Sequence, residues 1–131
     1  MKPRIVITIL TIGVAAGLIS IFLLPSQFEI LLWVVLAVVL GKLVQSSGLK
    51  RVFLGGLLGG ALAGFAITMA HIAFVQDYMA THKEEMNALQ PYMVGASYRL
   101  TLFVMAPVYW LILGIATGVA ARVWRSSSGN S

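Results

Sequence analysis

The sequence predicts an all-α integral membrane protein whose four transmembrane helices pack as one glycine-rich bundle. Its composition indicates this class, because 60% of the 131 residues are hydrophobic and only 10% are charged. A soluble domain averages about 25% charged residues. The hydrophobic residues also gather in four long runs instead of spreading evenly along the chain. A soluble domain and a disordered chain are therefore excluded.

Each apolar run approaches the roughly 20 residues that an α-helix needs to cross about 30 Å of hydrocarbon. The predicted spans cover about residues 5–24, 28–44, 52–75 and 100–123. Together they make residues 1–125 one transmembrane domain. The polar residues 126–131 are predicted to form a flexible tail.

The first span has recognisable ends. Met1–Arg4 resembles the basic start of a signal peptide, but the apolar run that follows is longer than the usual 7–15 residues. We therefore expect the span to be retained. Pro25 ends it, and Ser26 with Glu29 fits a capping box that would start the second span.

Basic residues gather on one side of the predicted topology. Four spans place both termini and loop 45–51 on the same side, which holds seven of the nine Lys and Arg residues and no acidic residue. These seven are Lys2, Arg4, Lys42, Lys50, Arg51, Arg122 and Arg125. The positive-inside rule then predicts cytoplasmic termini, in a bacterial-type inner membrane. Because the cations lie at the ends of spans, nucleic acid is not an expected partner.

The longest connection, residues 76–98, is predicted to carry a helical extension outside the membrane. Helical spacing continues to Leu89, and Pro91 must interrupt it soon afterwards. Thr81 offers an earlier point at which a separate short helix could begin. A continuous extension of the third span and a broken one both remain open.

Small residues recur every four positions in three of the spans, which lets helix backbones approach closely in lipid. The third span is predicted to be the hub, contacted by the first and the fourth. The glycines assigned to packing are Gly13, Gly17, Gly55, Gly56, Gly59, Gly60, Gly64, Gly114 and Gly118. They would close the bundle of one subunit or, alternatively, form a glycine zipper between subunits.

One polar group is predicted in the fourth span and one at the outer boundary. Pro107 would kink the fourth span beside Tyr109 and Trp110, so that the two aromatic side chains could line a cleft. At helical spacing, His71 and Tyr78 share a face with His82 and Glu85. The candidates for a lipid head group or quinone site are His71, Tyr78, Tyr98, Arg99, Tyr109 and Trp110.

A metal site is the other interpretation of the outer residues. Met79, His82 and Met86 lie three and four residues apart, and imidazole with thioether ligands suits copper, particularly Cu(I). The chain has no cysteine, so disulfides, thiolate metal sites and cysteine nucleophiles are excluded. No cofactor is specified by any motif.

The sequence predicts no catalytic residues, because it holds no phosphate loop, Ser-His-Asp set or zincin helix. We therefore expect a non-enzymatic assembly, accessory or partner-binding subunit. Its expected partners are membrane lipid and either another membrane protein or a second copy of itself. An oligomeric pore or small-solute transport component is the first alternative. A metal, lipid or quinone site around His71 and His82 on the extracytoplasmic face is the second.

Overall fold

The structure is a computed structural model that describes residues 1–129. Its described residues form helices and connecting turns, with no strand among them. The four long helices are α1 (Pro3–Phe22), α2 (Glu29–Ser46), α3 (Val52–Ala73) and α6 (Tyr98–Gly129). All four are long and apolar enough to cross a membrane, which confirms the predicted helical membrane class.

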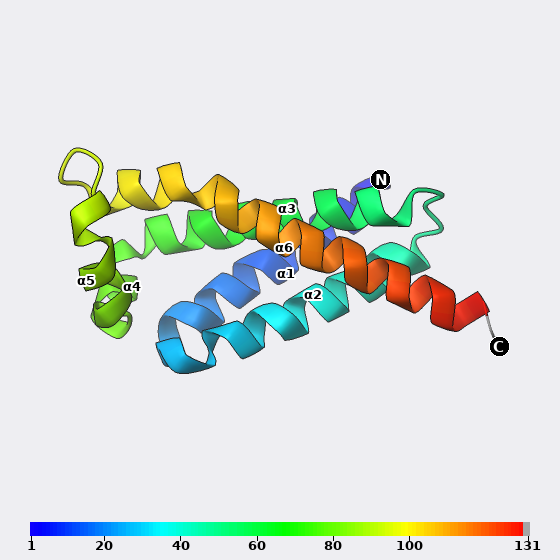
Figure 1. The fold of residues 1–131 in the computed structure, drawn as a ribbon, viewed down its shortest axis with the longest axis horizontal. Helices are drawn as coiled ribbons and strands as arrows, with labels where there is room; N and C mark the ends of the chain where they lie inside the picture. The colour runs from blue at the N-terminus through cyan, green and yellow to red at the C-terminus, as the bar shows by residue number, and fades with distance from the viewer. Residues whose placement is uncertain (130–131) are drawn as a thin grey trace.

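Four short elements connect the long helices. They are η1 (Ser26–Phe28), α4 (Val75–Thr81), α5 (Lys83–Leu89) and η2 (Gln90–Tyr92). Figure 1 shows α4 and α5 at one end of the bundle, near the turn between α1 and α2. We call this the cap end. The opposite end, where α1 begins and α6 ends, is the terminal end.

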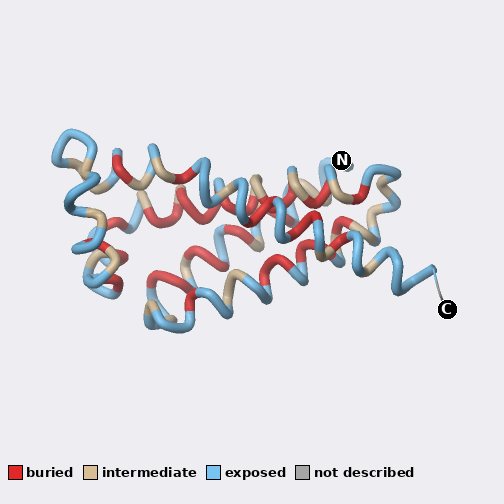
Figure 2. Tube along the Cα trace, viewed as in Figure 1, coloured by how far each residue is buried: buried red, intermediate tan, exposed pale blue. Residues whose placement is uncertain are grey.

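Helix α3 is the most buried of the four long helices. It packs mainly against α6 and α1, while α2 packs mainly against α6. Along each long helix, buried stretches alternate with exposed ones (Figure 2). That pattern fits helices that turn one face to the bundle and the other to lipid.

Several glycines occupy places where a side chain has no room. A Cβ added to Gly60 would lie 2.6 Å from the Cα of Gly114, and one added to Gly56 would lie 2.5 Å from the Cα of Gly118. On the other side of α3, a Cβ on Gly13 would lie 2.7 Å from the carbonyl oxygen of Ala63.

The extension after α3 is broken, not continuous. Phe74, with φ −110° and ψ 39°, ends α3, and His82, with φ −123° and ψ 44°, separates α4 from α5. These two breaks turn α4 toward the end of α1. There the Thr81 hydroxyl donates a hydrogen bond to the carbonyl oxygen of Ile21 at 3.1 Å.

Helix α6 continues further than the sequence predicts. Residues 126–129 were expected to begin a flexible tail, but they extend the helix to Gly129. Serine does not by itself stop a helix, because it costs far less there than glycine or proline. Here the Ser126 hydroxyl donates to the carbonyl oxygen of Val123 at 2.9 Å and that of Ser128 to the carbonyl oxygen of Trp124 at 2.8 Å. Residues 130 and 131 of the predicted tail lie outside the described residues.

Candidate functional site

Buried and half-buried polar side chains gather at the cap end of the bundle. They come from five helices and one junction: Ser20, Glu29, His71, Tyr78, His82 and Glu85. His82 is fully buried, and Glu29 is only 8% exposed. Burying a carboxylate and an imidazole costs free energy unless partners compensate for the lost water. Their partners therefore define what the cluster can do.

The carboxylate of Glu29 faces into the bundle. Ser20 donates a hydrogen bond to its Oε1 at 2.6 Å, and its Oε2 lies 3.6 Å from His82 Nε2. The predicted capping box is wrong, because neither η1 nor α2 has a side-chain cap. The 3-10 turn moves the start of α2 to Glu29, so Ser26 lies too far upstream to cap it. The carboxylate is then free to reach α1 and the cap.

The ring of His82 is held through its Nδ1. This atom lies 3.1 Å from the carbonyl oxygen of Tyr78 and 2.8 Å from the hydroxyl of Thr81. A carbonyl oxygen can only accept, so Nδ1 carries a ring hydrogen. The other ring nitrogen, Nε2, faces the carboxylate of Glu29. Nε2 is buried and has no hydrogen-bond partner.

Tyr78 connects the two histidines and a second carboxylate. Its ring stacks on His71 and on His82, with 4.2 Å between ring centroids in both pairs. Its hydroxyl donates to Glu85 Oε2 at 3.2 Å. Burial, together with the nearby charges of Glu29 and Glu85, raises the pKa of Tyr78, so the phenol keeps its proton and remains a donor.

The structure thus brings together the four residues that the helical spacing placed on one face. It does so across three helices instead of one, because the chain bends at Phe74 and His82. The partner that sequence reasoning missed is Glu29, from the other half of the chain. A signal was available, because Glu29 is the only acidic residue before Asp77 and lies beside an apolar run.

Three of these side chains form a compact donor set. Glu29, His82 and Glu85 each offer one ligand atom, and these atoms lie within 4.8 Å of one another. The two predicted thioether ligands belong to the adjoining apolar cluster, which shares Tyr78 with the polar one. Met86 is buried in an apolar cluster with Ile21, Ala70 and Tyr78, and Met79 packs against that cluster.

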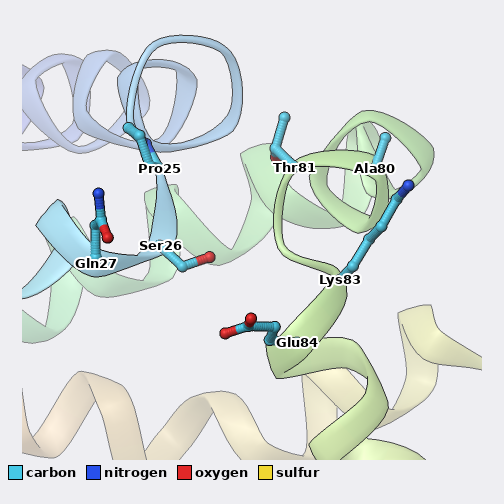
Figure 3. A pocket seen from close by; sticks show the side chains of 7 residues that line it. All are labelled: Pro25, Ser26, Gln27, Ala80, Thr81, Lys83 and Glu84. Carbon is cyan, nitrogen blue, oxygen red and sulfur yellow. The ribbon is translucent and has the colours of Figure 1, made fainter.

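A hollow of about 380 Å³ lies beside the donor set, between the α1–α2 turn and the α4–α5 junction. Figure 3 shows Ser26 and Glu84 turned toward the same open space from its two sides. Thr81 lines this hollow and also contacts the His82 ring. The side chain of Thr81 therefore links the open hollow to the buried imidazole of His82.

The other predicted site residues are spread over the molecule. Tyr98 packs against the apolar cluster of Met86, whereas Arg99 is exposed. Tyr109 is 59% exposed on the outer face of α6. Trp110 belongs to the α3–α6 contact, where its Nε1 donates to the hydroxyl of Thr68 at 2.9 Å.

Replacing Trp110 with phenylalanine should lower the free energy of unfolding by about 1 kcal/mol. The substitution removes the hydrogen bond between α6 and α3 and leaves the partly buried Thr68 hydroxyl without its donor. Thermal unfolding in mild detergent measures the effect. Tyr109→Phe is the matched control, because it removes an exposed hydroxyl from the same helix. Equal stability of the two variants would contradict the structural role of the Trp110 bond.

Comparisons with protein-family models, with curated proteins and with solved structures find no match to this chain.

Proposed function

We propose that this chain is a non-enzymatic membrane protein that holds a divalent transition-metal ion at the cap end of its bundle. The ligands would be Glu29, His82 and Glu85. One observation carries the proposal: His82 Nε2 is fully buried, has no hydrogen-bond partner and faces a carboxylate oxygen 3.6 Å away. In the tautomer that binds a metal, with the hydrogen on Nδ1, the Nε2 lone pair would face the carboxylate oxygen, and a cation between the two would attract both.

The spacing of the donor atoms supports this assignment. Ligand bonds of about 2.1 Å in tetrahedral geometry place two ligand atoms roughly 3.4 Å apart. The 3.6 Å between Glu29 Oε2 and His82 Nε2 is close to this value. Glu85 is half-buried, and a rotation of its side chain would bring the third oxygen to the same ion.

The hydrogen bonds around the ligands support it as well. Metal-binding histidines donate their other ring N–H to a carbonyl or carboxylate, and metal-binding carboxylates are themselves hydrogen-bonded. Here His82 Nδ1 faces the carbonyl of Tyr78, Ser20 donates to Glu29, and the Tyr78 hydroxyl donates to Glu85. Each proposed ligand is thus oriented by a partner of its own.

The chemistry of the donors selects the kind of ion. One imidazole and two carboxylates are harder ligands than thioethers, so they favour Zn²⁺ or Mn²⁺ over the Cu(I) that the methionine spacing suggests. Two carboxylates also balance a divalent charge, which matters at a buried site near the lipid boundary.

The proposal includes the finer parts of the predicted architecture. We assign the packing glycines to contacts within one subunit, since Gly56 and Gly60 already lie against the backbone of α6, and Gly13 against that of α3. These glycines are then not free to form a zipper between subunits, which the alternative of an oligomeric pore requires. Cytoplasmic termini would place the metal on the extracytoplasmic face. An accessory role would then use the metal to fix the shape of the cap that a partner meets.

Zinc titration of the purified full chain in mild detergent, after treatment with a chelator, tests the proposal. We expect one equivalent of Zn²⁺ to bind, and His82→Phe to weaken this binding by more than about 100-fold, since even outer-shell changes cost about 10–100-fold. His71→Phe is the matched control, because His71 stacks on the same tyrosine but lies outside the donor set.

Three results would overturn the proposal. They are the absence of stoichiometric zinc or manganese binding, equal binding by His82→Phe and the wild type, and equal losses in His71→Phe and His82→Phe. Titration with Cu(I) distinguishes the thioether alternative. Tight Cu(I) binding that Met86→Leu abolishes would replace the carboxylate site with a methionine site.

A further inference from the structure

The terminal end of the bundle carries a second hollow, of about 460 Å³. It lies between the start of α3 and the last turns of α6, at the end opposite to the proposed metal site. Four cations line it: Lys50, Arg51, Arg122 and Arg125. The rest of its lining is apolar, and no acidic residue contributes.

Two of these cations are held in place by neighbouring groups. Arg125 Nη1 donates a hydrogen bond to the carbonyl oxygen of Lys50 at 2.8 Å. The guanidinium of Arg122 lies over the ring of Phe53, 5.2 Å from its centroid. Neither contact neutralises a charge. The guanidinium groups are therefore oriented and keep their full positive charge for a ligand.

The start of α3 adds further donors at the same place. Arg51 is the N-cap residue of α3, and no side chain caps this helix start. The first amide groups of a helix have no acceptor within the helix, and they attract negative charge. They reinforce a site that the four side chains already define.

The surroundings of this hollow are typical of a membrane surface. Trp124 donates its Nε1 to the carbonyl oxygen of Val38 at 3.3 Å, and Lys42 Nζ lies 4.9 Å from the centroid of the same indole ring. Tryptophan with a neighbouring lysine is typical of the boundary between lipid and water. Leu54, 44% exposed, lines the hollow and gives it an apolar side.

We propose that this hollow binds the phosphate of an anionic glycerophospholipid, with the head group among the four cations and the acyl chains along the exposed apolar surface of α3. Basic pockets between membrane helices bind such head groups. Guanidinium groups also match phosphate oxygens through paired donors. The positive-inside rule predicts that this end faces the cytoplasm, where the inner leaflet supplies the lipid. The site is independent of the metal at the cap end.

Native mass spectrometry of the purified full chain tests the lipid site. The chain is titrated in mild detergent with dioleoyl-phosphatidylglycerol and, separately, with dioleoyl-phosphatidylcholine. The informative variant is Lys50→Gln with Arg51→Gln, because no hydrogen bond or ring contact of the described residues uses these two side chains. Lys2→Gln with Arg4→Gln is the matched control, since it removes the same charge from the same end but outside the hollow.

We expect the wild type to retain phosphatidylglycerol and to lose phosphatidylcholine. The Lys50 and Arg51 variant should bind phosphatidylglycerol at least about tenfold more weakly, since each cation at a membrane surface contributes about 1 kcal/mol. The Lys2 and Arg4 control should bind it like the wild type. Equal retention of the two lipids, or equal losses in the two variants, would overturn the proposal. Displacement of phosphatidylglycerol by millimolar inorganic phosphate would also overturn it and assign the site to a free anion.

Discussion

Replacing Gly60 with alanine should lower the free energy of unfolding by about 1–3 kcal/mol, the usual cost of forcing extra carbon into a packed core. The added methyl carbon would lie 2.6 Å from both the Cα of Gly114 and the carbonyl oxygen of Leu113. Backbone atoms of α6 cannot rotate away as side chains do. The two helices must therefore separate along their contact. Thermal or SDS-induced unfolding of the purified protein measures the loss.

Gly59→Ala is the control for this prediction. It makes the same change one residue earlier in the same helix, so both variants share the gain in helix propensity. Its methyl carbon would meet only the side-chain ends of Ile9, at 3.2 Å, and Val44, at 3.3 Å. These ends can shift by a few tenths of an ångström. If Gly60→Ala proved as stable as Gly59→Ala, the close approach of α3 and α6 would be refuted.

Saturating zinc should stabilise the folded protein by an amount that the binding constant fixes. A ligand that binds only the folded state contributes about 2.7 kcal/mol at a free concentration of 100 times its Kd. The proposed ligands come from α2, α5 and the α4–α5 junction, so the ion would join elements that are far apart in the chain. Removing it with a chelator should lower the unfolding temperature and speed amide hydrogen exchange in α4 and α5.

The exchange measurement separates a local effect from a general one. Amides in the middle of α3 and α6 should exchange equally with and without the metal, because those helices are held by their own contact. His82→Phe should show no response to zinc at any concentration. A zinc response of equal size in His82→Phe would show that the ion binds elsewhere.

The spans could be predicted from sequence because their limits are local. Pro25 follows the end of α1 closely, and Gly48, with a φ of +74°, lies in the turn after α2. The length of α6 could not be predicted in the same way. Its last turn consists of polar serines, whose hydroxyls bond to carbonyl oxygens three and four residues earlier. In the sequence alone, such a polar stretch is equally typical of a flexible tail.

The cap-end cluster could be predicted only in part. Spacing grouped His71 with Tyr78 and His82, since all three follow one another along a helical stretch. It could not supply Glu29, because the pairing of Glu29 with His82 depends on two chain breaks. The one at His82 lies beside the break that Thr81 offered as an alternative, but no proline or glycine marks the one at Phe74. The sequence therefore allowed Glu29 to be interpreted as part of a helix cap with Ser26, but it did not indicate that its partner is His82.

The distance along the chain between Glu29 and its partners sets an order of events during synthesis. Ser20, nine residues away, can bond to the carboxylate as soon as α1 and α2 form a hairpin. Ribosomes add about 5–20 residues per second, so residue 82 follows residue 29 by roughly 3–10 s. During that interval we expect the Ser20 hydroxyl to be the partner of the carboxylate. In the α1–α2 hairpin, Glu29 would thus have only its bond to Ser20, and its contact with His82 would form after the later helices are made.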